Sequence, residues 1–513
     1  MPPTAKDITD CVRLLEALVE EPALLAEVDL ETRNQLLIAA GRVSRPERNE
    51  QRLLSRAIRK KKKRAARAED EAKLVRAGIR QKRLSPVFVT PEPLALEASQ
   101  GGTFRATSDP AESREPGPAL NVPRCCYVCK APCNHVHFFY DQMCSECGDF
   151  NYQKRSQTAN LKGRVALISG ARVKIGYQAA ILLLRAGARV IVTTRFPRDA
   201  ALRYASEVDY ADWGQRLQIY GLDLRHTPSV EAFARHLLQS EARLDFMLHN
   251  ACQTVRRPSG FYRHLMDGEL GPLNALPGAA RVLLEQYEAM RASASRQLTS
   301  AEKAHSEPLA LGLHAAPALS QVALTREDLE TGQQLFPLGQ LDADLQQVDL
   351  RALNSWRLSL DQVGTVELLE VQLVNAIAPF VLNARLRQLM QKPRTFDKHI
   401  VNVSAMEGQF YRRFKTDKHP HTNMAKAALN MMTRTSAPDY AKDGIFMNSV
   451  DTGWVTDEDA AHIAQRKTEE NGFHPPLDIV DGAARIVDPI FDGLNTGHHV
   501  WGQFLKDYRP TAW

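Results

Sequence analysis

The sequence predicts an α/β protein whose main domain is a doubly wound parallel sheet. The segment GRVALISG, residues 163–170, is typical of a buried strand that runs into a glycine turn. The segment YQAAILLLRAG, residues 177–187, predicts a helix that ends at a glycine, and ARVIVTTR, residues 188–195, predicts a second strand. This alternation continues to about residue 252 and resumes at residue 367, which indicates parallel strands joined by crossover helices.

The remaining segments break this rhythm. Residues 6–41 have apolar positions at helical spacing and predict two short helices. Residues 84–123 are rich in Pro, Gly, Ser and Glu and show no periodicity. We therefore expect a helical, basic N-terminal region (1–83), a disordered linker (84–123), a cysteine-rich metal-binding module (124–158) and the α/β domain (159–513) with an insertion at about 253–366.

A strongly basic arm precedes the linker. Residues 42–83 hold 17 Lys/Arg and 5 Asp/Glu, so the rest of the chain is net acidic although the whole chain carries a net charge of +6. Such an arm supplies salt-dependent contacts to phosphates, but it lacks the interleaved aromatic residues that stack on bases. We expect residues 42–83 to bind nucleic acid or an acidic partner as an accessory property.

Hydropathy gives no sign of a membrane protein. No uninterrupted apolar run reaches the length needed to span a bilayer. The first residues, MPPTAKDITD, lack a basic stretch followed by an apolar one, so we expect no secretory signal. The sequence therefore predicts a cytoplasmic protein without a membrane partner.

Six of the eight cysteines lie between residues 125 and 147. Within this cluster, two Cys-x-x-Cys pairs are separated by fourteen residues, and each pair places two thiolates on one turn. Two such pairs form a tetrahedral Cys₄ site, which is typical of structural zinc because no coordination position stays open. The predicted ligands are Cys126, Cys129, Cys144 and Cys147. The alternatives for a single position, with less suitable spacing, are Cys125, Cys133, His135 and His137.

A glycine turn follows the first predicted strand, at residues 169–176. A turn at this place lets backbone N–H groups at the start of the next helix approach a pyrophosphate. The second strand ends in Thr194 and Arg195. An acid there would bind the ribose 2′-hydroxyl of NAD, whereas an arginine suits a 2′-phosphate. Because Arg172 and Lys174 add positive charge on the same side, the sequence favours NADP(H) over NAD(H).

The order of these segments, from residue 161 to residue 513, resembles the short-chain dehydrogenase/reductase family, whose fold is Rossmann-like. The family's glycine turn is Thr-Gly-x-x-x-Gly-x-Gly; here Lys174 stands in place of the middle glycine. His249 and Cys252 likewise replace the outer residues of the family's Asn-Asn-Ala-Gly. The resemblance implies a cofactor site made by Ser169, Gly170, Arg172, Lys174, Ile175, Gly176, Arg195, Asp223, Asn250, Ala251, Lys426, Thr452 and Gly453, with Thr456 also in place.

The resemblance also implies catalytic residues. Asn375 takes the position of the family's helix asparagine, Ser404 follows the fifth strand, and Lys426 matches the lysine of Tyr-x-x-x-Lys. In the family the tyrosine is the acid/base, and the lysine lowers its pKa and binds the nicotinamide ribose. The serine orients the substrate oxygen, and the asparagine holds a water in a proton relay. At the tyrosine position this chain has Thr422, whose hydroxyl is a far weaker acid than a phenol.

Three replacements for the tyrosine are open. Tyr411 lies in the long segment before Lys426 and can swing back into the site. His419 or His421 can act as the acid, because imidazole titrates near neutral pH. Alternatively, Thr422 passes a proton to Lys426 through water.

The expected function is NADP(H)-dependent hydride transfer to or from a carbonyl or alcohol, with a non-standard acid/base. Arg412 and Arg413, in the basic segment before Lys426, suit an anionic small-molecule substrate. The alternative is a catalytically silent dinucleotide-binding scaffold or sensor, favoured by the lost tyrosine and the altered glycine turn. We expect the insertion near the mouth of the pocket, as a lid or an interface. The resemblance further implies a homo-oligomer, assembled through the helices that carry Asn375 and Lys426.

Overall fold

The computed structural model describes residues 3–92, 96–98, 104–106, 117–297, 311–330, 332–412 and 415–513. The chain forms two compact units, Met1–Ala72 and Lys73–Trp513. The first unit ends earlier than the boundary predicted at residue 83. Much of the predicted linker 84–123, and part of the insertion, lie outside the described residues. In the described part of the linker the prediction of disorder is wrong, because Phe88 and Thr90 hydrogen-bond to the rest of the second unit and β3 begins at Ala119.

The first unit is helical. It contains α1 (Ala5–Glu20), the 3₁₀ turn η1 (Pro22–Ala26), α2 (Leu30–Ser44) and most of α3 (Arg48–Leu74). A capping box starts α1, since the Thr4 hydroxyl accepts from the backbone N–H of Asp7 and the Asp7 carboxylate accepts from that of Thr4. Neither α1 nor α2 contains a buried residue. The binding of nucleic acid or an acidic partner by this region stays a prediction.

An eight-stranded sheet forms the centre of the second unit, in the order β12-β11-β10-β9-β8-β5-β6-β7. Neighbouring strands from β7 to β11 run parallel, and only the edge strand β12 (Arg509–Thr511) is antiparallel in this sheet. The order reverses between β5 and β8, which confirms the predicted doubly wound, Rossmann-like sheet. The parallel strands are β5 (Val165–Ser169), β6 (Arg189–Thr194), β7 (Leu217–Gly221), β8 (Phe246–His249), β9 (Lys398–Ser404), β10 (Ile445–Asp451) and β11 (Phe504–Lys506).

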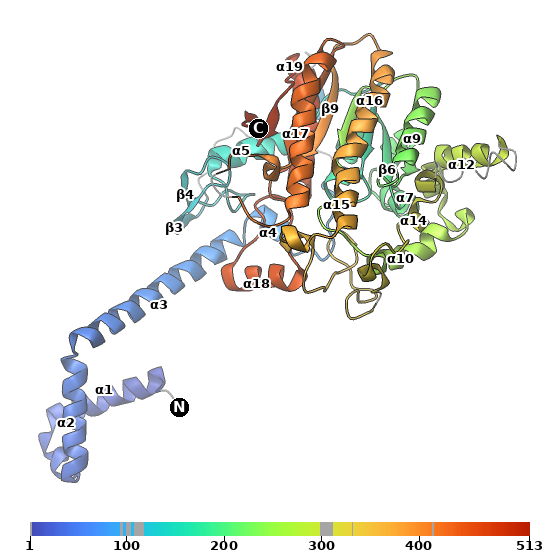
Figure 1. Cartoon of the computed structure of the whole chain (residues 1–513). Coiled ribbons are helices and arrows are strands. Elements are labelled where there is room, and N and C mark those ends of the chain that lie inside the picture. The colour runs from blue at the N-terminus through green and yellow to red at the C-terminus, as the bar shows by residue number, and fades with distance from the viewer. Residues whose placement is uncertain are drawn as a thin grey trace. The chain divides into compact units, whose positions relative to one another are not determined.

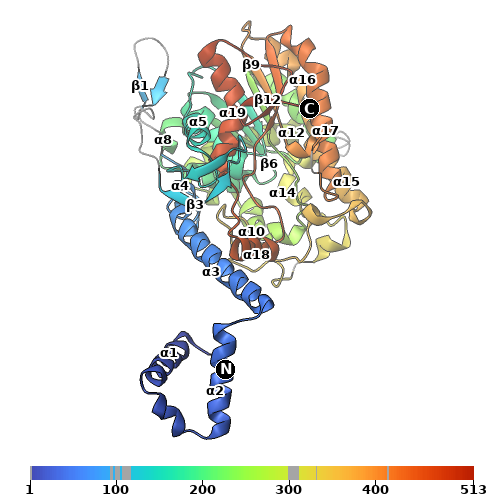
Figure 2. The same ribbon diagram turned by 90° about the vertical axis from the view of Figure 1, so that its left-hand side faces the viewer.

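Helices cover both faces of this sheet (Figure 1). On one face, α6 (Lys174–Arg185) packs on α19 (Ile479–Thr496). On the other, a continuous helix, Thr365–Gln391, packs against α9 (Thr227–Ser240) and α17 (Pro420–Ala441). Figure 2 shows α19 and α17 on opposite sides of the strands. The continuous helix consists of α15 (Thr365–Gln372), the π-turn η7 (Leu373–Ile377) and α16 (Ala378–Gln391).

Among the described residues, Thr365–Gln391 is the one helix long and apolar enough to cross a membrane by length and composition. Core helices of globular proteins pass the same test. Its side chains Leu382, Leu386 and Leu389 are buried in the main hydrophobic core of the second unit. Its apolar window is 33% buried, and Leu369, Ile377 and Phe380 are exposed, so the sheet accounts for only part of its apolar character.

Shorter elements complete the second unit. Two small antiparallel hairpins, β1–β2 and β3–β4, precede the central sheet. Their strands are β1 (Leu96–Ala98), β2 (Phe104–Ala106), β3 (Ala119–Cys125) and β4 (Pro132–His135). The further helices are α4 (Gly78–Lys82), α5 (Ser145–Arg155), α7 (Pro197–Ala205), α8 (Tyr210–Trp213), α10 (Ser259–Leu270), α11 (Gly278–Val282), α12 (Glu285–Gln297), α14 (Ala316–Leu319) and α18 (Ala461–Asn471).

A buried ion pair fastens the cysteine-rich module to the α/β domain. At the end of α5, the Arg155 guanidinium donates to both carboxylate oxygens of Asp478, at 2.5 and 2.7 Å. Asp478 is also the N-cap of α19, where its Oδ1 accepts from the backbone N–H groups of Val480 and Asp481. One carboxylate therefore caps a helix and neutralises an arginine, and it links two segments far apart in the sequence.

Replacing Arg155 by Met should lower the free energy of unfolding of the second unit by about 3–5 kcal/mol, because Asp478 would stay buried without its counter-charge. Arg385→Met is the matched control, since Arg385 pairs with Glu231 while its own side chain is 58% exposed. That variant should lose less than about 1 kcal/mol. Urea unfolding of both variants measures the difference, and equal stability would contradict the assignment of Arg155 to the fold.

Candidate functional site

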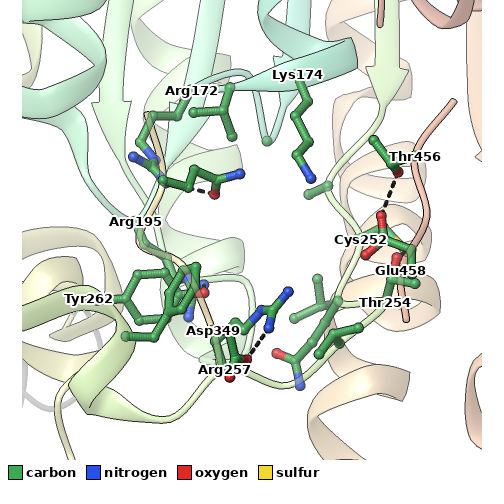
Figure 3. Close-up of a pocket in the computed structure, with 18 of the residues that line it drawn as sticks. Arg172, Lys174, Arg195, Cys252, Thr254, Arg257, Tyr262, Asp349, Thr456 and Glu458 are labelled. Carbon is green, nitrogen blue, oxygen red and sulfur yellow. Dashed lines mark hydrogen bonds and ion pairs between the residues drawn. The ribbon is translucent and has the colours of Figure 1, made fainter. Parts of the chain in front are cut away.

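A cavity of about 560 Å³ lies at the carboxyl ends of the strands β5, β6, β7 and β8. The loops that follow these four strands line it (Figure 3). The cavity is therefore next to the point where the strand order reverses, which is the usual ligand site of a doubly wound sheet.

The glycine turn brings two strand ends into close contact. Gly170 has φ +69°, and a Cβ on it would lie 2.6 Å from the Ala251 Cα. The Asn250 side-chain amide donates to the Gly170 carbonyl at 2.9 Å, and the Ala251 N–H donates to the Ser169 hydroxyl at 3.2 Å. A Cβ on Gly176 would lie 2.4 Å from the same Gly170 carbonyl. The turn thus needs both glycines, and Ser169 and Asn250 brace it.

Lys174 keeps the backbone conformation of the glycine that it replaces. Its φ is +57°, in the left-handed region, and it opens α6. Its side chain points into the cavity (Figure 3). Burial opposes its charge, but the carboxylates of Glu458, Asp344 and Asp342 outweigh this effect and raise the pKa of the ammonium. The structure therefore places a permanent cation at the start of α6.

Two arginines line the cavity, Arg195 directly after β6 and Arg172 in the glycine turn after β5. Arg195 donates to the Tyr262 hydroxyl at 2.7 Å, and its guanidinium lies 4.7 Å from the centre of that ring. No carboxylate of the described chain lies within ion-pair distance of Arg195. Arg172, by contrast, pairs with Asp199 at 2.6 Å. Arg195 is thus the more available of the two for an anion.

Asp223, predicted to contact the cofactor, is fully occupied by a neighbour. Its carboxylate accepts from the Arg225 backbone N–H, Nε and Nη2 at 2.7–3.2 Å. Burial opposes its charge, yet the Arg225 guanidinium holds the pKa of this carboxyl below its ordinary value. Both residues line the cavity. The opposite charges of Asp223 and Arg225 nearly cancel, so this pair adds little net charge to the cavity wall that follows β7.

The loop after β10 supplies another wall. Residues 455–461 of this loop line the cavity, and within them the Thr456 hydroxyl donates to the Glu458 carboxylate at 2.6 Å. The predicted Thr452 and Gly453 do not line it within the described chain. Gly453 has φ +76° and turns the chain from β10 into this loop.

Ser404 and Lys426 come together at the end of β9. The Ser404 hydroxyl donates to the Lys426 carbonyl at 3.4 Å, and the Lys426 ammonium donates to the Val403 carbonyl at 2.8 Å. Both side chains are buried, and neither lines the cavity. The 3₁₀ turn η8 (Met406–Gly408) covers them, since a Cβ on Gly408 would lie 2.8 Å from the Lys426 carbonyl carbon.

Asn375 lies in the one-turn π-helix η7, a deviation that is frequent at functional sites. Its Oδ1 accepts from the Gln253 N–H at 2.7 Å, and its amide donates to the Gln253 carbonyl at 3.4 Å. The side chain is buried. It therefore holds the loop after β8 against the helix.

Thr422 and Tyr411 occupy opposite environments. Thr422 lies one helical turn before Lys426 on α17; its hydroxyl is buried and finds no hydrogen-bond partner in the described chain. Tyr411 is 93% exposed. The structure thus brings Thr422, and not Tyr411, to the neighbourhood of Ser404 and Lys426.

The two histidines that precede Thr422 are both buried. His419 stacks on Trp356, with the ring centres 3.8 Å apart, and burial lowers its pKa. The Nε2 of His421 lies 3.3 Å from the Glu367 carboxylate, but neither ring nitrogen makes a hydrogen bond in the described chain. Of the two histidines, His421 is therefore the one whose imidazole is available for proton transfer.

The basic segment before α17 folds back on itself. Arg412 pairs with Glu407 at 3.1 Å, and Lys415 donates to the carbonyls of Glu407 and Gln409. Arg413 lies outside the described residues. The binding of an anionic substrate by this segment stays a prediction.

Sequence reasoning missed cavity residues from the insertion. Arg257 pairs with Asp349, and Gln346 accepts from Arg172 at 3.3 Å; all of them line the cavity. Tyr262, which holds Arg195, also belongs to the insertion. These residues lie in no family motif, so only the acidic, Gln-rich run at residues 341–350 gave a local signal.

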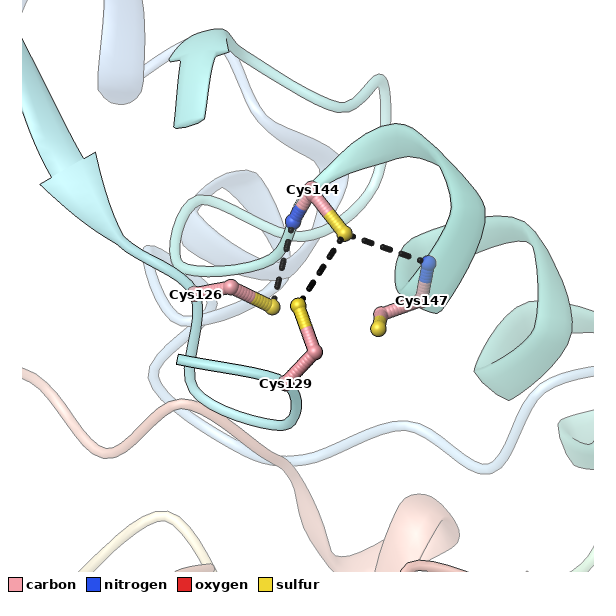
Figure 4. A group of neighbouring side chains, drawn as sticks. All are labelled: Cys126, Cys129, Cys144 and Cys147. Carbon is pink, nitrogen blue, oxygen red and sulfur yellow. Dashed lines mark hydrogen bonds between the residues drawn. The ribbon is translucent and has the colours of Figure 1, made fainter. Parts of the chain in front are cut away.

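The four predicted cysteine ligands come together in the cysteine-rich module (Figure 4). Their sulfurs lie within 4.8 Å of one another, and those of Cys129 and Cys144 are 3.8 Å apart. A tetrahedral zinc with Zn–S bonds of about 2.3 Å requires sulfurs about 3.8 Å apart. Of the alternatives, His137 is engaged, because its Nδ1 accepts from two backbone N–H groups. The geometry fits a closed Cys₄ metal site.

Two family sequence models match the chain. The model described as short chain dehydrogenase matches residues 164–264. The model described as Enoyl-(Acyl carrier protein) reductase matches residues 359–476. The two matches therefore lie on either side of most of the predicted insertion.

Two curated proteins are similar to the chain. Uncharacterized protein R665 of Acanthamoeba polyphaga mimivirus is 30% identical over 394 residues, which are 75% of this chain and 74% of R665. Dehydrogenase/reductase SDR family member 13 of Bos taurus is 36% identical over 118 residues, 22% of this chain. The chain spans 30% of the length of the bovine protein.

Among solved structures, a short-chain dehydrogenase/reductase from Serratia marcescens BCRC 10948 aligns with 67% of this chain and 96% of its own, with a TM-score of 0.41 and 15% identity. We draw no conclusion from a structural similarity of this extent. The sheet order and the two family matches agree, and together they support membership of the short-chain dehydrogenase/reductase family.

Proposed function

We propose that the protein is an NADP(H)-dependent oxidoreductase that transfers hydride to or from a carbonyl or alcohol substrate. The proposal rests mainly on the environment of Arg195. This residue follows β6 and lines the cavity, and it has no carboxylate partner in the described chain. An acid at the end of this strand would favour NAD instead. The retention of Ser404 and Lys426 supports hydride transfer in addition to nucleotide binding.

The residues of the cavity fit a dinucleotide phosphate. The turn at Gly170 leaves the N-terminus of α6 open to a pyrophosphate. When bound, the nicotinamide supplies or accepts the hydride. The basic side chains along the described cavity wall are Arg172, Lys174, Arg195, Arg225 and Arg257.

The chain's own groups would act at the substrate oxygen. The Ser404 hydroxyl donates a hydrogen bond to it, and the Thr422 hydroxyl passes a proton between it and Lys426 through water. In the structure η8 packs against Lys426, so substrate access to Lys426 requires η8 to shift. The basic side chains of this segment favour an anionic substrate.

A second candidate is a catalytically silent NADP(H)-binding sensor. It is favoured by the burial of Ser404, Thr422 and Lys426 and by their distance from the cavity lining. In this case the dinucleotide binds and no carbonyl substrate is turned over. The two candidates share the cofactor site and differ in turnover alone.

Cofactor preference is tested by nicotinamide fluorescence. The full chain should bind NADPH more tightly than NADH, and Arg195→Ala should raise the Kd for NADPH about 10- to 100-fold, the loss of one charge-assisted hydrogen bond. The Kd for NADH should change little. Arg263→Ala, at an exposed arginine of α10, is the matched control. Equal losses for NADH and NADPH would remove the 2′-phosphate assignment.

Turnover is tested by NADPH consumption with a panel of aldehydes and ketones, including anionic ones. Thr422→Val should lower kcat about 10²–10⁴-fold if its hydroxyl carries the proton. Tyr411→Phe should be unaffected, because this side chain is exposed. The opposite pattern would assign the acid to Tyr411. NADPH binding without turnover of any carbonyl by the wild type would favour the silent sensor.

We also propose that the Cys₄ site holds a structural zinc. Cys129→Ser should lose the metal and lower the melting temperature, since a small module of this kind gains its folding energy from the ion. Cys125→Ser is the matched control, because Cys125 is exposed and lies outside the group of four sulfurs. The zinc content per chain, measured with a colorimetric chelator, tests this ligand set. Equal zinc content in the two variants would contradict the ligand set.

A further inference from the structure

A tyrosine of the metal site reaches the loop that forms one wall of the cavity. Tyr127 lies between the ligands Cys126 and Cys129, and its hydroxyl accepts from the Trp454 backbone N–H at 3.0 Å. Trp454 belongs to residues 452–458, which we name the cofactor loop. Thr456 and Glu458 of this loop line the cavity. A single hydrogen bond thus joins the metal knuckle to the wall of the dinucleotide site.

The same two regions share a hydrophobic core. Cys126 is buried in one cluster with Val455 and Ile479, and Ile175 of the glycine-turn region packs against that cluster. Val455, Ile479 and Ile175 also line the cavity. Cys126, a predicted metal ligand, and the apolar wall of the cavity therefore belong to one hydrophobic cluster.

The chain beyond the cofactor loop is held by the same region. The Gln142 side chain donates to the His474 carbonyl at 2.7 Å, and the Tyr140 hydroxyl donates to Asp481 at 2.6 Å. Arg83 donates to the carbonyls of Pro475 and Leu477. The segment from Trp454 to the start of α19 is therefore fixed at both ends by residues outside the α/β core.

We infer that Tyr127 is a positioning residue that couples metal occupancy of the Cys₄ site to dinucleotide affinity. This inference rests on the proposed NADP(H) function. The metal fixes the Cys126–Cys129 knuckle, and the knuckle fixes the Tyr127 hydroxyl. Without the metal, the Trp454 N–H loses its acceptor and the cofactor loop must be ordered when the dinucleotide binds, which weakens binding. Metal loss then weakens dinucleotide binding from a distance.

The test compares four forms of the full chain: wild type with zinc, wild type stripped of zinc by a chelator, Tyr127→Phe and Tyr152→Phe. Tyr152 is the matched control, since its ring contacts Phe138 and Phe139 in the same module and, in the described chain, its hydroxyl makes no hydrogen bond to the cofactor loop. For each form, zinc content, the Kd for NADPH and hydrogen exchange of the peptide that contains Trp454 are measured.

Tyr127→Phe should keep its zinc, exchange faster at Trp454 and bind NADPH about 2- to 10-fold more weakly, as expected for one lost hydrogen bond. The zinc-free wild type should be weaker still, and Tyr152→Phe should equal the wild type. Unchanged affinity and exchange in Tyr127→Phe and in the zinc-free protein would overturn the coupling and leave the proposed function intact. Failure of the zinc-loaded wild type to bind NADPH would overturn both.

Discussion

The close approach of β5 and β8 is the contact on which the geometry of the α/β domain depends. At Gly170 there is no space for a side chain, because a Cβ would lie 2.6 Å from the Ala251 Cα. The Asn250 amide and the Ser169 hydroxyl close the remaining gap with hydrogen bonds. Since the strand order reverses at this pair, any larger residue would separate the two halves of the sheet at their junction. The start of α6 and the part of the cavity that Gly170, Asn250 and Ala251 line take their positions from this contact.

The features that the sequence predicted are those carried by local patterns. The alternation of strand and helix, the two Cys-x-x-Cys pairs and the arginine after β6 each follow from spacing within a few residues, and each is found where it was expected. The missed cavity residues depend on tertiary contacts across long separations. Gln346 reaches Arg172 from the far end of an insertion that no motif describes. The burial of Ser404 and Lys426 under η8 could not be predicted either, because it depends on tertiary contacts that the residue types alone do not define.

The catalytic end of the site has an unusual concentration of unpaired polar atoms. The Thr422 hydroxyl and the Nδ1 of His421 are buried without a hydrogen bond in the described chain, whereas the Nε2 of His421 lies 3.3 Å from the Glu367 carboxylate. Each such group costs about 1–3 kcal/mol of stability. A core selected for stability alone would replace them with apolar side chains of similar volume. Their presence beside Lys426 is therefore better explained by a partner that enters the site, whether water or substrate, than by packing.

The proposed metal site lies next to a part of the chain that the sheet does not hold in place. Strands β5 to β10 are fixed by their ladders, but the chain after β10 leaves the sheet and crosses to α19 without strand partners in the described structure. Loops of this kind belong to the least stable parts of a protein. Metal coordination provides a free energy of about 10–16 kcal/mol to a small cysteine-ligated module. In the coupling that we infer, Tyr127 between two predicted ligands and Cys126 in the core shared with Val455 transfer part of that rigidity to the wall of the cavity.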